Sequence, residues 1–180
     1  MKNRRITIVA FLLLAALTLG IGYAAVTTQL FIDGSATISQ DVANNEFNED
    51  IYFTSVKNNK TGEYVTSVSK DEGLGYSASI TTSNNDRATF TVTGLSNEGE
   101  TLTISYKVKN DSKFDATITL NTSSSVSNDN VFEVTCTASN GVTLAAGQEA
   151  IVDVTVKVKT QVDVETTSSI SLILDVTSVK

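Results

Sequence analysis

The segment AIVDVTVKVK, residues 150–159, decides the fold class because apolar side chains recur at every second position from Ala150 to Val158. The intervening positions are mostly Asp, Thr and Lys. A period of two indicates a β-strand with one buried and one solvated face, as in antiparallel sheets. β-branched residues such as Val and Thr suit that pleated, half-buried surface. The segment therefore predicts a long strand that covers a hydrophobic core.

The same alternation recurs over most of the chain. Clusters of Asn, Asp, Ser and Gly separate the alternating runs and predict turns, and no part of the chain after residue 50 sustains helical spacing. Short strands at this spacing predict an all-β fold, an antiparallel β-sandwich of about eight to ten strands with Ig-like or jelly-roll topology. Besides residues 150–158, the clearest strands are expected at residues 76–80, 88–92, 102–108, 114–120, 132–138 and 170–176.

The N-terminus has the pattern of a secretory signal peptide. Three basic residues fall within the first five positions, an uncharged and mostly apolar run covers residues 8–19, and small residues follow. Gly22 and Ala24 place small side chains third and first before the bond to Ala25, so cleavage is expected there. The apolar run is expected to be helical, and it is near the lower length limit of a membrane-spanning helix. Retention as an N-terminal anchor is therefore the alternative to cleavage.

Three segments follow from this division. Residues 1–24 form the signal peptide, residues 25–50 an N-terminal strand with a polar tether, and residues 51–180 the β-sandwich domain. There is no second long apolar run, so we expect no stable membrane span after cleavage. The protein is expected outside the cell, at the cell surface or in an extracellular matrix.

The charge balance disfavours a nucleic-acid partner. The chain has 13 basic and 20 acidic residues, and loss of the three basic residues of the signal peptide changes the net charge from −7 to −10. Nucleic-acid binding proteins need a basic face, whereas the Lys residues here are spread singly among acids. An acidic surface rich in Thr and Ser fits an exported protein.

Cys136 is the single cysteine, so the chain cannot form an intramolecular disulfide. Alternation places Cys136 on the same strand face as Phe132 and Val134. A buried free cysteine commonly behaves as a small hydrophobic residue, and we expect that role here. An intermolecular disulfide and lipid attachment are the alternatives.

The sequence lacks the histidine on which several common catalytic sites depend. The chain has no His, which excludes Ser-His-Asp and Cys-His catalysis and an HExxH zinc site, and one Cys is too few for a thiolate zinc site. Acidic residues occur in turns; Asp86 and Asp129 each lie beside two Asn residues, but neither follows the spacing of a Ca²⁺-binding loop. We therefore expect no enzyme activity, no catalytic residue, no bound metal and no cofactor.

Three stretches carry a resemblance to a known group of proteins. They are GIGYAAVTTQLFIDGSATI (residues 20–38), GLSNEGETL (residues 94–102) and YKVKN through FDA (residues 106–116). They resemble the TasA and camelysin (CalY) group, extracellular biofilm-matrix proteins processed by a SipW-type signal peptidase. The resemblance implies that peptidase as a processing partner. Camelysin-type relatives have been classed as metallopeptidases, but this chain offers no imidazole for such an activity.

The segment after the cleavage site suggests how such a protein would assemble. Val26, Thr28, Leu30 and Ile32 lie on one side of an extended ribbon, and a polar tether follows. A free strand of this kind can add to the sheet of a neighbouring subunit. The leading expectation is a secreted fibre subunit that assembles with itself, and with other matrix proteins as further candidate partners. The alternative is a monomeric cell-surface adhesive or binding module, which would pair the strand within its own sheet.

Overall fold

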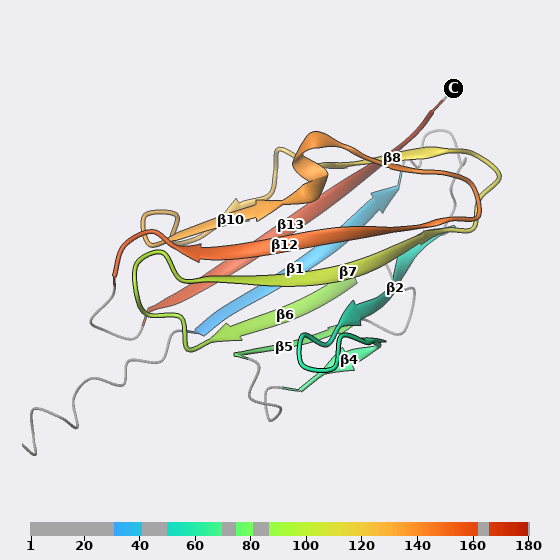
Figure 1. Cartoon of the computed structure of the whole chain (residues 1–180). Coiled ribbons are helices and arrows are strands. Elements are labelled where there is room, and N and C mark those ends of the chain that lie inside the picture. Colours follow the sequence, from blue (N-terminus) through green and yellow to red (C-terminus); the bar gives the residue numbers. More distant parts are fainter. Residues whose placement is uncertain (1–30, 41–49, 70–74, 81–86, 162–165, 180) are drawn as a thin grey trace, which may run out of the picture.

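A computed structural model describes residues 31–40, 50–69, 75–80, 87–161 and 166–179. These residues form two facing sheets, and the only helical element among them is the short 3-10 helix η2 (Thr137–Asn140). Figure 1 shows the two sheets as layers with their strands running along the long axis of the domain. The expected all-β sandwich is confirmed.

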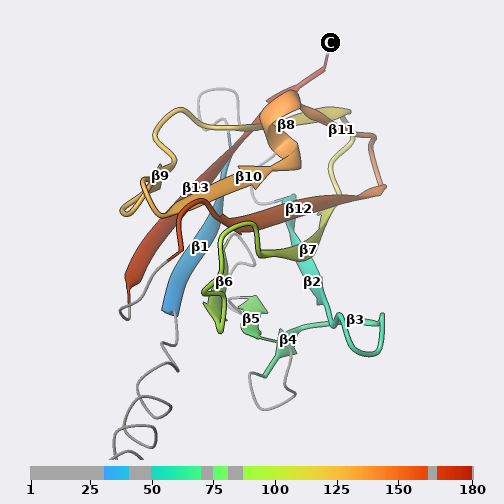
Figure 2. The ribbon, with the colours of Figure 1, turned by 60° about the vertical axis from the view of Figure 1, so that its left-hand side comes forward.

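The larger sheet has eight strands. Its order is β11 (Val142–Leu144), β8 (Ala116–Leu120), β13 (Thr167–Ser178), β1 (Phe31–Gln40), β6 (Arg87–Thr93), β5 (Tyr76–Ile80) and β4 (Ser67–Val68), and β9 (Ser125–Val126) also pairs with β13. The five-stranded sheet has the order β10 (Phe132–Cys136), β12 (Glu149–Val158), β7 (Thr101–Asn110), β2 (Ile51–Lys57) and β3 (Tyr64–Val65). Figure 2 shows β13 and β1 in one layer and β12 and β7 in the other.

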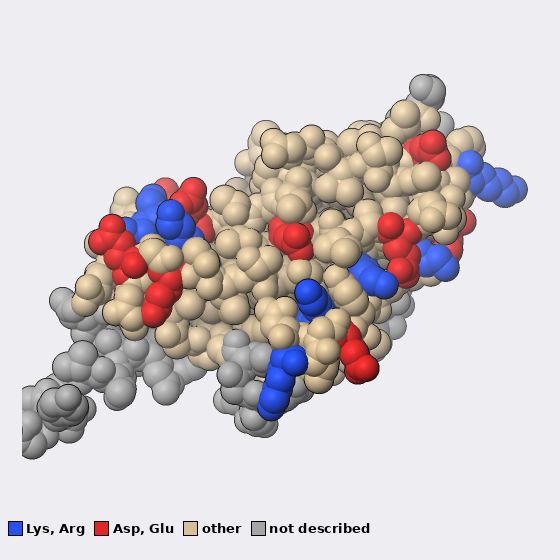
Figure 3. Space-filling view, viewed as in Figure 1, with Lys and Arg blue, Asp and Glu red and all other residues tan. Residues whose placement is uncertain are grey.

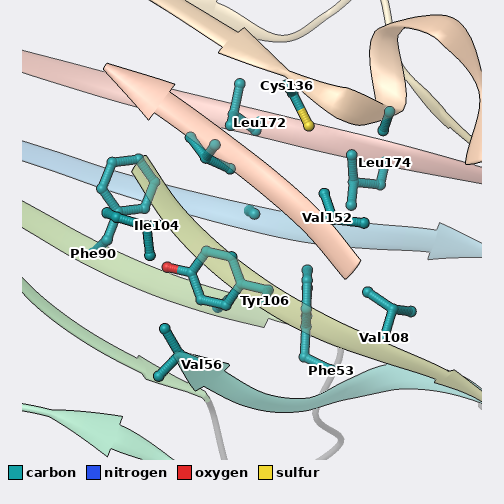
Figure 4. Close-up of a cluster of buried hydrophobic side chains, with 14 of the residues drawn as sticks. Phe53, Val56, Phe90, Ile104, Tyr106, Val108, Cys136, Val152, Leu172 and Leu174 are labelled. Atoms are coloured by element: carbon teal, nitrogen blue, oxygen red, sulfur yellow. The ribbon is translucent and has the colours of Figure 1, made fainter. Parts of the chain in front are cut away.

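The core lies between the sheets and is built by the alternation that the sequence displays. On β12, every Val from Val152 to Val158 is at most 1% exposed. Phe53 and Tyr106 meet edge to face, with ring centroids 5.6 Å apart. Figure 4 shows these rings with Phe90 between the layers. Burying an aliphatic or aromatic side chain of this size contributes roughly 1.5–3 kcal/mol, so the core supplies the stability that a chain without a disulfide needs.

Two tyrosine hydroxyls connect the sheets. Tyr106 of β7 donates to the carbonyl oxygen of Thr89 in β6 at 3.4 Å, and Tyr76 of β5 donates to the carbonyl oxygen of Lys57 in β2 at 2.6 Å. Burial, and then the nearby Tyr76 hydroxyl, raise the pKa of Tyr106 above its usual value. The Tyr106 phenol therefore stays neutral and acts as a hydrogen-bond donor inside the core.

The structure differs from the expected strands in three places. β1 continues to Gln40, well into the segment 25–50 that was expected to hold a strand and a polar tether, and β1 pairs with β13 in parallel. Phe114 lies before β8 and is 48% exposed, and Ala138 lies in η2 rather than in β10. Alternation predicts which residues are extended but not which strands become neighbours. The first and last strands can pair in parallel because no short connection has to join them.

Cys136 is buried beside the core, as expected, at 5% exposure. Burial raises the pKa of its thiol. Because the thiolate is the reactive form, a buried thiol with a raised pKa is inert.

The expected signal peptide, residues 1–24, and the cleavage residues Gly22, Ala24 and Ala25 lie outside the described residues. Within the described part of the chain, no helix is long and apolar enough to span a membrane.

Candidate functional site

The N-terminal strand β1 occupies the middle of the eight-stranded sheet. It pairs in parallel with β13 over its whole length and antiparallel with β6 from Phe31 to Thr37. We call the gap between β13 and β6 the β1 slot. Among the described residues, β1 alone joins the β11-β8-β13 part of this sheet to the β6-β5-β4 part. The sheet is therefore continuous only when a strand fills the slot.

Of the four residues expected to form an inter-subunit strand, only Ile32 lies among the described residues. Ile32 lies in β1, where its register partners are Ser168 of β13 and Val92 of β6 in the same chain. Val26, Thr28 and Leu30 lie outside the described residues. The segment that fills the slot is thus the later part of the N-terminal strand.

Gly34 has no room for a side chain beside the neighbouring strand. It lies directly opposite Phe90 of β6, and a Cβ atom at position 34 would be 2.1 Å from Cζ of that ring. Phe90 is 2% exposed, so its ring fills the space that a larger side chain at position 34 would need. This contact was not predicted from the sequence, although a single Gly within a strand is a known sign of close approach.

The rest of the inward face of β1 is also small or aliphatic. Ala36 is 2% exposed and Ile38 is 4% exposed, and both belong to the buried core cluster. β1 therefore joins the core through compact side chains, and its main chain contributes hydrogen bonds on both of its edges.

The outward side of the slot carries hydroxyl groups. Ser35 lies opposite Ser171 of β13 on one side and Thr89 of β6 on the other, and the hydroxyl of Thr89 is 3.0 Å from that of Ser79. Beside β1, on β4 to β6, hydroxyl groups line an open hollow of about 270 Å³ with no charged residue in its lining. The hollow offers hydrogen bonds to a neutral polar ligand and no group for acid–base catalysis.

The outer face of the five-stranded sheet is charged. Figure 3 shows Lys and Arg interleaved with Asp and Glu on this side of the molecule. Exposed pairs of this kind contribute about 0–1 kcal/mol each and mark a solvated surface. The described residues form three ion pairs, Lys107–Glu149 at 3.2 Å, Lys109–Asp111 at 2.9 Å and Lys157–Glu133 at 4.0 Å.

Asp111 has two polar side-chain partners on this face. Tyr52 donates a hydrogen bond to it and Lys109 pairs with it, and these contacts lower the pKa of Asp111. The same hydrogen bond raises the pKa of Tyr52. Asp111 is thus held ionised, which is the opposite of what a general acid requires. Among the described residues, no group of three or more acids and Cys is placed to hold a metal ion.

No protein-family model matches the sequence, and no curated protein is significantly similar to it.

Proposed function

We propose that this protein is a secreted structural subunit of extracellular fibres, in which the N-terminal strand of one subunit completes the sheet of the next. The observation that carries the proposal is the position of β1. Among the described strands it comes first in the chain, and it fills a slot on which the continuity of the sheet depends. The same strand of a second copy has the same side chains for that slot.

Cleavage would make β1 exchangeable. After a cut before Ala25, only residues 25–30 would precede β1, so the strand could leave one slot and enter another without threading a folded element. A second copy's β1 can make the same main-chain hydrogen bonds to β13 and β6 as the subunit's own β1. Its Gly34 and Ala36 also have the same size, so they fit the same slot. The choice between them depends on effective concentration, which favours the strand that is tethered nearby. Assembly should therefore be concentration-dependent.

The N-terminal sequence supports the extracellular part of the proposal. The signal-peptide pattern, the net charge of −10 after cleavage and the resemblance to the TasA and camelysin group all agree with a matrix protein. On this reading a SipW-type peptidase processes the precursor, and the fibre partner is a second copy of the chain, with other matrix proteins as further candidates.

A cysteine pair tests the strand exchange. In a Cys136→Ala background, Ser35→Cys and Thr89→Cys place two thiols on register partners of β1 and β6. Fibres assembled under reducing conditions and then oxidised should give a ladder of covalent oligomers on a non-reducing denaturing gel. Oxidation of dilute monomer before assembly should give an intrachain disulfide, and that locked protein should not form fibres.

The Ser35→Cys variant alone, also without Cys136, is the matched control, since it can yield at most covalent dimers. Intrachain disulfides only, in fibres seen by electron microscopy, would show that β1 stays in its own sheet. A lack of fibres in the wild-type protein at high concentration would contradict the fibre function itself.

Removal of the signal peptide can be tested separately from fibre assembly. Mass spectrometry of the secreted protein should show Ala25 as the first residue, because Gly22 and Ala24 place small side chains before that bond. Recovery of intact protein beginning at Met1 in the membrane fraction would instead identify the anchored form, whose β1 could not be withdrawn freely.

A monomeric adhesive or binding module is the second candidate function. It is favoured by the pairing of β1 within its own sheet and by the uncharged, hydroxyl-lined hollow over β4 to β6. This candidate predicts intrachain cross-links at every protein concentration, so the cysteine experiment separates the two functions.

A further inference from the structure

The end of the sandwich where β1 finishes carries exposed apolar side chains. We call this the distal end and define it by residues 110–116, 144–148 and 177–179. Phe114 and Val179, each 48% exposed, are two of the three exposed large hydrophobic residues in the described chain. Their segments are adjacent, because the amide of Val179 donates to the carbonyl oxygen of Asp115 at 2.8 Å. Figure 1 shows the C-terminus and the arrowhead of β1 at this end.

A buried hydrogen-bond network holds Phe114 in place. The side-chain amide of Asn110 donates to the carbonyl oxygens of Phe114 at 2.8 Å and Leu144 at 3.1 Å. Its oxygen accepts from the amide of Ser112 at 2.9 Å and from the Ser112 hydroxyl at 2.6 Å. Asn110 is 0% exposed and Ser112 is 7% exposed. These hydrogen bonds hold the main chain of the loop in place, and the ring of Phe114 is half exposed to solvent.

The register of β1 determines where a second copy would lie. In the slot, Gln40 is the register partner of Val176, close to the distal end. If a second copy's strand filled the slot in this register, its own folded domain would resume at Ile51, after the nine residues 41–49 and Asp50. An extended chain spans at most about 3.6 Å per residue, so the donor domain lies within roughly 40 Å of the distal end. The donor domain is therefore tethered to the end of the sandwich where Phe114 and Val179 are exposed.

We infer that the distal end is a docking surface for a second copy of this chain, with Phe114 and Val179 as its apolar contacts. The inference rests on the proposed strand exchange and adds a second contact to it. Strand insertion holds the two copies together by a tether, and docking at the distal end fixes their relative position. The two contacts reinforce each other because the tether raises the local concentration of the docking surfaces.

The test combines Phe114→Ser and Val179→Ser in the Ser35→Cys, Thr89→Cys, Cys136→Ala background. Interchain disulfide formation during assembly is measured against time, and the melting temperature of the monomer is measured in parallel. We expect the rate of interchain cross-linking to fall about tenfold, because two half-exposed apolar side chains no longer gain burial. The melting temperature should stay unchanged, since neither side chain is buried in the monomer.

Ile151→Ser is the matched control. Ile151 is 49% exposed, but it lies in β12 on the outer face of the five-stranded sheet, so its replacement should leave cross-linking at the rate of the parent protein. An equal loss of rate in this control would show a non-specific effect of surface hydrophobicity and would overturn the docking surface. A lower melting temperature in the Phe114→Ser, Val179→Ser protein would also overturn it, because the monomer's own chain would then cover these residues.

The two proposals fail in different ways. If the parent protein exchanges strands and the Phe114→Ser, Val179→Ser variant exchanges equally fast, only the docking surface is wrong. If the parent protein gives no interchain product at any concentration, the proposed strand exchange is wrong. The docking surface, which rests on that exchange, is then wrong as well.

Discussion

Replacing Gly34 with valine should strongly destabilise the sandwich and prevent any copy of β1 from filling the slot. A Cβ at this position would lie 2.1 Å from Cζ of Phe90 and 2.5 Å from both Cε atoms, far inside van der Waals contact. Phe90 is 2% exposed and belongs to the core cluster, so the ring can move only if its core neighbours shift. Overpacking a core typically costs 1–3 kcal/mol, and we expect a loss of about 3 kcal/mol or more in the free energy of unfolding. Urea denaturation followed by circular dichroism measures it.

Ser35→Val is the control for Gly34→Val, because it puts the same side chain one residue further along β1, on the outward face. Valine has a higher strand propensity than serine, so the Ser35→Val protein should be about as stable as the wild type. Adding Phe90→Ala to Gly34→Val should cost less than the sum of the two single changes, since the ring and the new side chain compete for one space. Equal stability of Gly34→Val and Ser35→Val would contradict the close packing of β1 on β6.

Much of this fold could be predicted from the sequence because alternation is a local signal. The runs that became β5, β6, β7 and β12 were predicted nearly to their ends, and the burial of Cys136 followed from its position in such a run. A turn at Gly147 could also be predicted, because glycine is common in turns. In the structure Gly147 has a φ of 73°, which glycine adopts without steric cost.

The β1 slot could not be predicted, because strand order is a property of the whole chain. The residues of β1 read as a short strand followed by a polar tether, and nothing local in residues 33–40 indicates a parallel partner more than a hundred residues away. The close contact at Gly34 depends on Phe90 in the same way. Phe114 was expected in a strand by its alternation with Ala116, but the turn formed around Asn110 and Ser112 delays the start of β8.

Asn110 is a polar residue whose buried hydrogen bonds could not be predicted from the sequence. It was predicted to lie in a turn, but it is the last residue of β7 and is 0% exposed. Its side chain reaches the carbonyl oxygen of Leu144, 34 residues further along the chain. Its main chain also accepts from the amide of Gly147 at 2.8 Å and donates to the carbonyl oxygen of Gln148 at 3.0 Å. One side chain therefore joins the two loops at the distal end.

Replacing Asn110 with alanine should consequently destabilise the protein by about 3 kcal/mol or more. The change removes four side-chain hydrogen bonds and leaves the amide of Ser112 and the carbonyl oxygen of Leu144 without these partners in a buried site. Each buried polar group left unsatisfied costs about 1–3 kcal/mol. Asn121→Ala is the matched control, because Asn121 is only partly buried and its partners can bind water, so its loss should cost about 1 kcal/mol. Equal losses for the two variants in urea denaturation would contradict the role given to Asn110.

Asn110→Asp separates the hydrogen bonds from the volume of the side chain and adds a pH dependence. The carboxylate keeps the acceptor for Ser112 but faces the carbonyl oxygens of Phe114 and Leu144, to which the amide donated. Burial and these oxygens disfavour the charged form, so the pKa of the new carboxyl should be higher in the folded protein than its unfolded value of about 3.9. The folded state then binds the proton more tightly, and the destabilisation relative to wild type grows as pH rises above the unfolded pKa until it levels off above the folded one. Urea denaturation of both proteins from pH 4 to pH 8 should show this divergence, whereas a constant difference would mean that the loop opens and exposes residue 110 to water.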